Sequence, residues 1–414
     1  MNNSIHITAP QACTGCALCA NVCSKDAIRM EWNEDGFLVP EVNPDACINC
    51  GACVRACPAQ PEHLKKLQQS GSGYAAQSPA AYGGWNADEE THLASSSGGI
   101  FTALAESVFA EGGCVFGVIW ENKDTAVFSK AETREELVAM RGSKYTQAIP
   151  GDVYRQVKQE LKNGRKVLFC GTSCQVYALK RYLRKDDENL ILVDILCHGV
   201  PSHNLLKAYI RHYEKTESKE LSHIQFRDKA GNWQQYHLKK FFTDGSTLSH
   251  CNRADMFMRL FVGDYALNKA CYSCPHATFP RVGDITLGDF WGNTEQRHPE
   301  WPITNGIGSV IGNTPKGCML LTELQVQGSI TLQQIPLEEL IEGQRFTYMR
   351  PQGTIHPQRQ RALQLLRSLN ISGAYRFLIE TVQFGPFRVK RNSLLHKAFA
   401  KFSNVLRCLL NRRK

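Results

Sequence analysis

The N-terminal part of the sequence spells one cysteine pattern twice. Residues 13–23 read CTGCALCANVC and residues 47–57 read CINCGACVRAC, so both runs have the spacing C-x2-C-x2-C-x3-C. Structural zinc sites favour two C-x2-C pairs separated by a loop, and they do not crowd four cysteines into eleven residues. The doubled run therefore predicts two iron–sulfur clusters rather than two zinc sites.

The spacing is that of the bacterial two-cluster ferredoxin pattern, which also predicts how the cysteines divide. The first three cysteines of a run wrap one [4Fe-4S] cluster, and the fourth reaches across to the other cluster. The expected ligand sets are Cys13, Cys16, Cys19 and Cys57 for one cluster, and Cys23, Cys47, Cys50 and Cys53 for the other. The second run ends in Cys57-Pro58 as the pattern expects, whereas the first ends in Cys23-Ser24, which changes only the local turn.

Cysteine number and the start of the chain favour a reducing compartment. The 17 cysteines are an odd number, which argues against a closed set of disulfides. The opening residues MNNSIHITAP have neither the basic nor the apolar region of a secretory signal. No stretch approaches the roughly 18 consecutive apolar residues of a membrane span. These observations predict a cytoplasmic protein whose clustered cysteines bind metal or carry out redox chemistry.

The net charge of +9 is concentrated at one end of the chain. Residues 388–414 contain nine Lys and Arg and no acid, whereas residues 1–64 contain seven acids and three bases. This distribution gives little support to nucleic-acid binding. Apolar residues recur at helical spacing over 394–410, which predicts a basic amphipathic helix. Two interpretations stay open: peripheral contact with the inner face of an anionic membrane, or packing of the apolar face on the core.

Pattern and composition divide the chain into four parts. The predicted fold is an α+β ferredoxin-like two-cluster domain (1–62), a linker (63–80), a mixed α/β core (81–345) and a helical, basic C-terminal region (346–414). Residues 30–42 predict a hairpin that turns at Asp35-Gly36. Within the core, helical and strand patterns alternate from Tyr82 to about residue 345, with irregular insertions after residue 215, which is typical of an α/β sheet.

Four cysteines outside the doubled run stand where chemistry is expected. Cys174 follows a predicted strand at a strand-to-helix turn, Cys197 ends the next strand, and Cys271 and Cys274 form a C-x2-C pair. The carboxyl ends of neighbouring strands converge on one crevice of an α/β sheet, so Cys174 and Cys197 are expected to be neighbours. The C-x2-C loop can then complete a set of four ligands. For the remaining cysteines the preferred interpretation is that of small buried hydrophobic residues: Cys114, Cys251, Cys318 and Cys408.

Six motifs in order resemble one known family. They are SSSGGIFTALAES, RGSKYTQA, FCGTSCQVYALKRYL, LCHGVPS, FRDKAGNW and RVGDITLGDFWG. Together they cover roughly residues 80–345 and resemble the beta-subunit family of the deazaflavin (coenzyme F-420) hydrogenases and dehydrogenases. Some members of that family carry a fused two-cluster ferredoxin domain, including bacterial ones encoded near polysaccharide genes.

The resemblance implies a flavin, FAD or FMN, and a third [4Fe-4S] cluster in the core. By motif, Cys174, Cys197, Cys271 and Cys274 are the implied ligands of that cluster, with Cys170 a buried neighbour or, less favoured, an alternative ligand. The residues assigned to the flavin are Ser95, Ser96, Ser97, Gly98, Gly99, Lys144, Tyr145, Gly171 and Thr172.

Physical chemistry gives some of these flavin residues a second interpretation. Ser95 to Gly99 precede a predicted helix, where serine and glycine bind a phosphate or simply cap the helix. Asp289 and Trp291 fall near the cofactor region of the family, although Trp291 can also be a packing residue. His198 can donate to a cluster sulfur or be a satisfied surface histidine. The sequence has no G-x-G-x-x-G after a strand and no G-x4-G-K-[ST], so nicotinamide-binding and P-loop sites lack their signature.

These features predict a flavin- and iron–sulfur-dependent oxidoreductase. Electrons would move between a deazaflavin-like hydride carrier and a redox partner protein, through a flavin and three clusters. No side-chain acid or base is required for hydride transfer, so no catalytic residue is assigned. The alternative is an electron-transfer adaptor without a substrate of its own, which serves a partner in polysaccharide biosynthesis.

Overall fold

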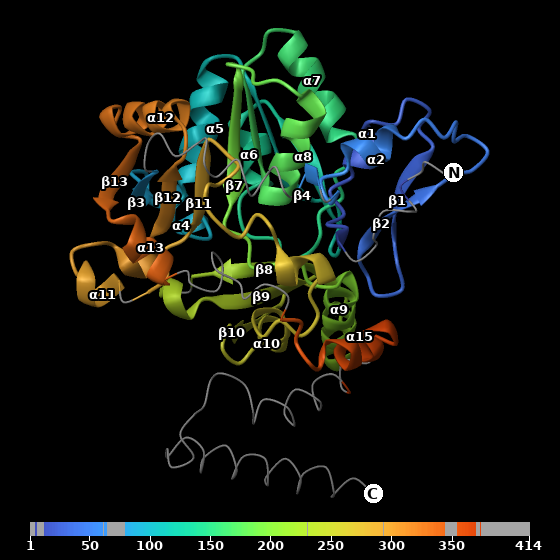
Figure 1. Cartoon of the computed structure of the whole chain (residues 1–414). Coiled ribbons are helices and arrows are strands. Elements are labelled where there is room, and N and C mark those ends of the chain that lie inside the picture. Colours follow the sequence, from blue (N-terminus) through green and yellow to red (C-terminus); the bar gives the residue numbers. More distant parts are fainter. Residues whose placement is uncertain are drawn as a thin grey trace, which may run out of the picture.

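The fold is described by a computed structural model. It describes residues 12–60, 62–63, 79–229, 231–292, 294–343 and 354–369, together with residues 5 and 373. Most of the predicted linker and the predicted amphipathic helix over 394–410 lie outside these residues. Figure 1 shows a cysteine-rich unit in blue beside a large sheet, and a smaller sheet that lies below the large one in this view.

The cysteine-rich unit has two short helices and one hairpin. Its elements are α1 (Leu18–Asn21), β1 (Ile28–Trp32), β2 (Leu38–Val42) and α2 (Ala52–Ala56). The strands pair antiparallel from Ile28–Val42 to Trp32–Leu38. Gly36 adopts a φ of +75° in the turn, a conformation that glycine reaches without steric cost. The hairpin predicted at Asp35-Gly36 is therefore confirmed.

The core contains one mixed sheet of eight strands. Its order is β13-β3-β12-β11-β7-β6-β4-β5. The strands are β3 (Ala80–Asn86), β4 (Cys114–Trp120), β5 (Ala126–Ala131), β6 (Val167–Thr172), β7 (Leu190–Ile195), β11 (Ile285–Asp289), β12 (Gly308–Gly312) and β13 (Ile330–Ile335). The central strands β4, β6, β7 and β11 are mutually parallel, and the other pairs are antiparallel. The predicted α/β sheet is confirmed, although β3 already begins at Ala80, inside the predicted linker.

Helices cover both faces of this sheet, as the alternation of helix and strand predicted. One face packs on α5 (Ile100–Ala110) and α12 (Pro315–Val326), and the other packs on α7 (Val153–Lys162) and α8 (Ser173–Leu183). On β6, Leu168 faces the first pair of helices while Val167 and Phe169 face the second pair, because successive strand residues point to opposite faces. Leu18 of α1 packs into the second layer, so the cysteine-rich unit lies on α7 and α8 (Figure 1).

The segment after residue 200 builds a second, smaller core. Strands β8 (Leu221–Asp228), β9 (His237–Phe242) and β10 (Thr247–Cys251) form an antiparallel sheet. Helices α9 (His203–Glu217), α10 (Met256–Val262) and α15 (Arg359–Arg367) pack against it. Phe37 from the cysteine-rich hairpin reaches the same cluster of side chains. The smaller core thus joins the far end of the described chain to its beginning.

Short elements connect the larger ones. They are α4 (Glu89–Ala94), α6 (Arg134–Val138), η4 (Trp233–Gln235), η5 (Lys269–Ser273), α11 (Thr294–Arg297), η6 (Ile303–Asn305) and α13 (Leu337–Gly343). No helix within the described ranges is long and apolar enough to cross a membrane.

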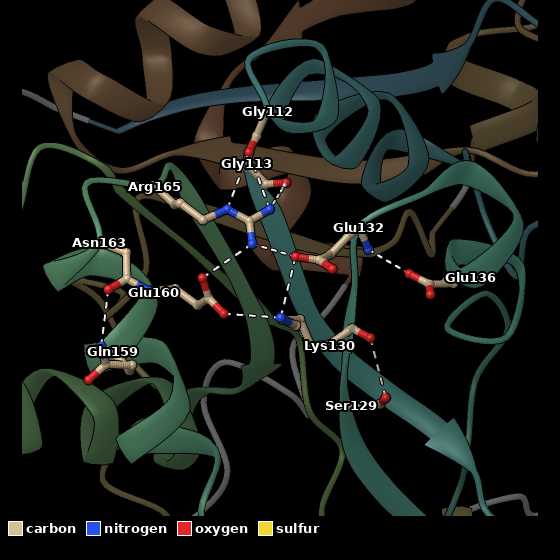
Figure 2. A network of polar contacts seen from close by, with 10 residues as sticks. All are labelled: Gly112, Gly113, Ser129, Lys130, Glu132, Glu136, Gln159, Glu160, Asn163 and Arg165. Atoms are coloured by element: carbon tan, nitrogen blue, oxygen red, sulfur yellow. Dashed lines mark hydrogen bonds and ion pairs between the residues drawn. The ribbon is translucent and has the colours of Figure 1, made fainter.

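A network of ion pairs ties the β5 edge of the sheet to its helices (Figure 2). Glu160 of α7 accepts from Lys130 of β5 at 3.0 Å and from Arg165 at 3.2 Å. Arg165 also pairs with Glu132 and donates to the carbonyl oxygens of Gly112 and Gly113. The network joins three segments that are far apart in sequence, and it lies beside Cys114, whose pKa is raised by burial and affected by these charges.

Candidate functional site

The cysteine-bearing loops of the core leave the sheet at one edge. Thr172 at the end of β6 pairs with Ile195 at the end of β7, and Ile195 pairs with Leu287 of β11. Because these strands are parallel, their carboxyl ends meet at the same edge. Cys174 and Cys197 follow β6 and β7 directly, so the prediction that they leave adjacent strands is confirmed.

The structure gathers four cysteines of the doubled run into what we call the first set, Cys13, Cys16, Cys19 and Cys57. Burial raises the pKa of Cys19, and its neighbours Cys16, Cys13 and Cys57 raise it further. Burial likewise raises the pKa of Cys16 to about 12 and that of Cys57 to about 11. These are the four cysteines that the crossed pattern assigns to one cluster.

The other four, which we call the second set, surround a small cavity. The cavity is lined by Cys23, Cys47, Cys50 and Cys53, with Gly51 and Ile48 among the other lining residues. Cys23 comes from the first run and the other three come from the second. Cys50 is exposed, so this end of the unit reaches solvent. The structure therefore brings together the cysteines that the crossed pattern pairs, and their role as ligands stays a proposal.

The remaining candidate ligands form a core set, Cys174, Cys197, Cys271 and Cys274. Burial raises the pKa of Cys174, and Cys274 and Cys197 are among the neighbours that raise it further. Cys271 lies close to the loop after Cys197, because its sulfur accepts from the Val200 N–H at 3.4 Å. Among the described residues, no three His, Cys, Asp or Glu side chains are grouped so that they could hold one metal ion.

The three sets follow one another through the molecule. Cys16 of the first set is among the neighbours that raise the pKa of Cys174 in the core set, after burial. Tyr154 of α7 is buried between them: its hydroxyl donates to the Cys16 carbonyl at 2.8 Å, and both cysteines contribute to raising its pKa, after burial. Cys57 of the first set is in turn a neighbour of Cys53 in the second set. The order is therefore core set, first set, second set.

Two arginines from the core hold the cysteine-rich unit. Arg155 of α7 donates to the carbonyl oxygens of Ala20, Asn21 and Cys23 at 3.2, 2.9 and 2.8 Å, at the end of α1. Arg181 of α8 donates to the carbonyl oxygen of Ala56 at 2.9 Å, at the end of α2. A cation is favourable at both positions because the last carbonyls of a helix carry partial negative charge.

The serine–glycine run before α5 uses most of its hydroxyls internally. Ser95 donates to the carbonyl of Thr91 and Ser97 to the carbonyl of Ile307, both at 2.7 Å. The Ser96 hydroxyl accepts from the N–H of Ser143 at 2.8 Å. What remains at this point for a ligand is the start of α5, where the first backbone N–H groups have no partner within the helix.

The two glycines of the run have structural reasons of their own. A Cβ on Gly98 would lie 2.1 Å from the Gly84 carbonyl oxygen of β3 and 2.8 Å from the Gly308 nitrogen of β12. Gly98 therefore allows two strands and a helix to approach closely. Gly99 has a φ of +80° and is the N-terminal cap residue of α5.

Lys144 and Tyr145 lie beside this run but differ in their contacts. The Lys144 ammonium donates to the carbonyls of Met140, Arg141 and Gly142 at 3.3, 3.0 and 3.2 Å. Burial lowers the pKa of Lys144 to about 8. The Tyr145 hydroxyl instead accepts from Arg227 at 3.2 Å, so Tyr145 belongs to a second group of residues.

That second group is centred on Arg227, which the sequence reasoning did not assign as a site residue. Its guanidinium is buried, donates to both carboxylate oxygens of Asp289 at 2.6 and 3.1 Å, and donates to the Ser96 carbonyl at 3.1 Å. It lies 4.1 Å from the ring centre of Tyr236 and 5.5 Å from that of Trp291. The sequence signal that could have identified Arg227 as a site residue is the motif FRDKAGNW, which contains it.

Lys229 of the same motif fixes the loops around the site. Its ammonium donates to the carbonyls of His92 at 2.6 Å and Ser97 at 2.8 Å, and to that of Asn305. Two buried hydrogen-bond donors indicate that a ligand fits beside Lys229. Neither Arg227 Nε nor Trp233 Nε1 finds an acceptor among the described residues. Trp233 stacks on Trp291 with ring centres 4.6 Å apart, so both donors lie at the same aromatic cluster.

Gly171 and Thr172 lie nearer to the core set than to the serine–glycine run. Thr172 caps α8 through a capping box with Gln175. Its hydroxyl is 3.2 Å from the sulfur of Cys174. A Cβ on Gly171 would lie 3.1 Å from Gln175 Oε1. The flavin residues implied by the resemblance are thus divided between two places at this edge of the sheet.

The remaining singled-out residues have other partners. His198 pairs with Asp264 at 2.8 Å. Burial is the main cause that raises the pKa of Cys170 to about 12. Asp194 raises this pKa further, and Lys144 lowers it. Cys114 is fully buried as predicted, whereas Cys251 and Cys318 are half-buried, so the prediction is wrong for these two. Cys408 lies outside the described residues.

Comparison with known proteins matches three consecutive stretches of the chain to family models. Residues 12–60 match the 4Fe-4S dicluster domain. Residues 81–152 match the N-terminal part, and residues 164–338 the C-terminal part, of the coenzyme F420 hydrogenase/dehydrogenase beta subunit. The two beta-subunit matches together cover more than half of the chain.

The chain also matches chains of solved structures, one of which belongs to a hydrogenase complex. It is described as the xenon derivatization of the F420-reducing [NiFe] hydrogenase complex from Methanosarcina barkeri, and it matches with a TM-score of 0.44 at 15% identity, over 74% of this chain and 93% of that chain. No curated protein matches. The family and the dicluster domain indicate an iron–sulfur, electron-transferring oxidoreductase. The chain belongs to the coenzyme F420 hydrogenase/dehydrogenase beta-subunit family and carries a 4Fe-4S dicluster domain at its N-terminal end.

Proposed function

We propose that the protein is a flavin- and iron–sulfur-dependent oxidoreductase that moves electrons between a hydride carrier and a redox partner protein. The path runs through the core set, the first set and the second set, each holding one [4Fe-4S] cluster. The observation that carries this proposal is the position of Tyr154, whose hydroxyl donates to the Cys16 carbonyl at 2.8 Å and so joins the core to the dicluster domain beside both cysteine sets.

The donor chemistry of the three sets fits iron–sulfur clusters. Thiolates are the ligands that these clusters use, and each set offers four cysteines from two or more segments. Burial raises the pKa of Cys16, Cys19 and Cys174, so a thiolate at these positions requires a positive partner, which iron supplies. The exposed Cys50 makes the second set the suitable end for exchange with a partner protein.

The residues around Arg227 support a flavin site. Arg227 Nε and Trp233 Nε1 are buried donors in need of acceptors, and a flavin ring carries carbonyl oxygens and nitrogens that accept hydrogen bonds. Tyr145 and Trp291 add aromatic surface beside them. A bound flavin would supply the exchange between a two-electron hydride and single electrons. The protein's own residues bind it, orient it and exclude water.

The identity of the hydride carrier rests on the family. Members are named for coenzyme F420, a deazaflavin, so a deazaflavin-like carrier is the proposed substrate class. The partner protein is proposed on the same ground, since beta subunits by name belong with other subunits.

One observation favours the second candidate, an electron-transfer adaptor without its own substrate. Ser95 and Ser97 direct their hydroxyls to backbone carbonyls, so the serine–glycine run offers a phosphate little beyond the backbone N–H groups of α5. An adaptor would contain the clusters and no flavin.

Anaerobically purified protein separates the two candidates. The oxidoreductase is expected to contain one flavin and about twelve iron atoms per chain, four for each cluster, and its flavin absorbance should bleach on addition of a reduced deazaflavin. Clusters without flavin would identify the adaptor.

A matched pair of variants tests the flavin site. Trp233→Phe removes the unpartnered N–H and keeps an aromatic ring, so it should weaken flavin binding by about tenfold, the worth of one hydrogen bond of about 1.4 kcal/mol. Trp85→Phe, at a partly buried tryptophan that packs on Trp301, is the control. Equal flavin affinity in both variants would place the flavin elsewhere.

A further inference from the structure

Arg281 lies between η5 and β11 and has a buried side chain, 2% exposed. One arm of its guanidinium, Nη1, donates to the carbonyl of His276 at 2.8 Å. The other arm, Nη2, donates to the Ser173 hydroxyl at 2.7 Å, to Asp194 Oδ2 at 2.6 Å and to the Ile195 carbonyl at 3.3 Å. One planar group thus holds four partners.

The partners of Arg281 are placed next to the cysteines of the core set. Ser173 immediately precedes Cys174, Ile195 is two residues before Cys197, and His276 is two residues after Cys274. These three segments come from the β6–α8 turn, the end of β7 and the loop after η5. In the described part of the chain, these three segments all contact the Arg281 guanidinium. Because this group is planar and rigid, it fixes the directions of its hydrogen bonds to the segments.

Asp194 is the charged partner of Arg281 in this group of contacts. Its side chain is fully buried and accepts from Ser173 at 2.7 Å and from Thr286 at 2.6 Å, besides Arg281. A buried ion pair contributes little net stability, because removing both charges from water offsets their attraction. A pair at this place therefore calls for a role other than stability, and the three cysteine-bearing segments provide one.

We propose that Arg281 is a positioning residue for the core set: it holds the segments that carry Cys174, Cys197 and Cys274 in ligating arrangement, and its charge raises the reduction potential of the cluster they bind. The proposal rests on the proposed function, since it presupposes a cluster in the core set. Reduction adds a negative charge to the cluster, and a nearby buried cation favours that state. Without Arg281, Asp194 would be left as an uncompensated buried anion.

The test compares Arg281→Gln with Arg281→Lys and with Thr286→Val. Arg281→Gln removes the charge and the fork, so it should lose the core cluster, about four of about twelve iron atoms, or retain it at a more negative midpoint potential. Arg281→Lys keeps the charge beside Asp194, so its potential should stay close to that of the unmodified protein wherever the cluster is retained. Thr286→Val removes a bond to Asp194 but leaves every contact of Arg281 in place, and should change neither quantity.

A double variant separates positioning from folding. Arg281→Met combined with Asp194→Leu replaces the ion pair by apolar side chains, a change that commonly leaves stability intact. It should still unfold cooperatively, although the hydroxyls of Ser173 and Thr286 lose their acceptor, and it should lose the core cluster while the EPR signals of the two dicluster-domain clusters persist. Iron content by colorimetry and potentials by EPR-monitored redox titration are the readouts.

The outcomes have distinct meanings. Full iron and an unchanged core-cluster potential in both Arg281→Gln and the double variant would overturn the role of Arg281. Unmodified protein with about eight iron atoms would instead overturn the third cluster of the proposed function.

Discussion

Arg155 and Arg181 perform the same task for the two halves of the cysteine-rich unit. Each comes from a different core helix, and each donates to the last carbonyl oxygens of one short helix of that unit. Beyond those helices stand Cys23 and Cys57, the cysteines that cross from one set to the other. The repeat in the sequence is thus matched by a repeat in how the core holds it.

The two arginines can be tested by substitution. Arg155→Gln and Arg181→Gln should each lower the free energy of opening of the adjoining short helix by about 1–3 kcal/mol, because each removes charge-assisted hydrogen bonds to backbone carbonyls. Amide hydrogen exchange at α1 and α2 measures this opening. Arg134→Gln, which removes an exposed pair with Glu106, is the control and should leave both helices unchanged. Faster exchange in all three variants alike would point to general destabilisation instead.

Removal of the C-x2-C pair tests the third cluster directly. Cys271→Ala with Cys274→Ala should lower the iron content by one third, since one cluster of three is lost, and should leave the EPR signals of the dicluster domain intact. Cys251→Ala, at a half-buried cysteine outside the three sets, is the matched control. Unchanged iron in the double variant would mean that the core set holds no cluster.

His203 predicts a loss of stability in acid. It begins α9, its ring stacks on Trp32 of the hairpin with ring centres 4.3 Å apart, and its backbone N–H donates to the Gly36 carbonyl at 2.8 Å. Burial, with a smaller effect from Lys207, lowers its pKa from 6.5 to about 4, and Asp124 offsets part of this. Between pH 6.5 and about 4, His203 is protonated in the unfolded chain but not in the folded chain. The free energy of unfolding therefore decreases as the pH falls through this window.

At pH 5 the expected loss from this one group is about 2 kcal/mol relative to neutral pH. Unfolding by urea at several pH values measures it. In His203→Gln this contribution should disappear, so the difference in unfolding free energy between the two proteins should narrow toward acid. Parallel pH profiles for the two proteins would show that His203 does not titrate in this window.

Gly98 predicts a structural rather than a ligand-binding defect. Gly98→Ala should cost at least about 2 kcal/mol, because the added Cβ meets the backbone of β3 and β12. Gly112→Ala is the control: its Cβ meets nothing within 4 Å, but its φ of +69° makes about 1 kcal/mol of strain the expected cost. Chemical denaturation of the two variants measures the difference. A Gly98→Ala protein as stable as Gly112→Ala would mean that β3 and β12 can shift to accommodate the added Cβ at little cost in free energy.

The sequence predicted those features that depend on local pattern. The hairpin at Asp35-Gly36 and the alternation of helix and strand in the core follow from turn residues and apolar periodicity, and both are present. The division of eight cysteines into two groups follows from the two-cluster ferredoxin pattern, in which the fourth cysteine of each run reaches across to the other cluster. These groups are assembled in the structure as the pattern pairs them.

The features that escaped prediction depend on contacts between distant segments. Arg281 meets Ser173 across 108 residues and Arg155 meets Cys23 across 132. Arg281 opens the motif RVGDITLGDFWG, but nothing local to either arginine predicts its partner. The serines before α5 illustrate the same limit. A serine can bind a ligand or a carbonyl, and the carbonyl of Ile307 that Ser97 meets lies 210 residues away.

The manner in which Arg155 and Arg181 hold the cysteine-rich unit has a consequence for how the two parts can vary. Both arginines grip main-chain oxygens, which every amino acid supplies, so this part of the attachment does not depend on the side chains of the short helices, unlike the packing of Leu18. What cannot change is the length of those helices, because one added residue would turn the terminal carbonyls away from the arginines by about 100°. Insertions in this region should therefore be far more damaging than substitutions.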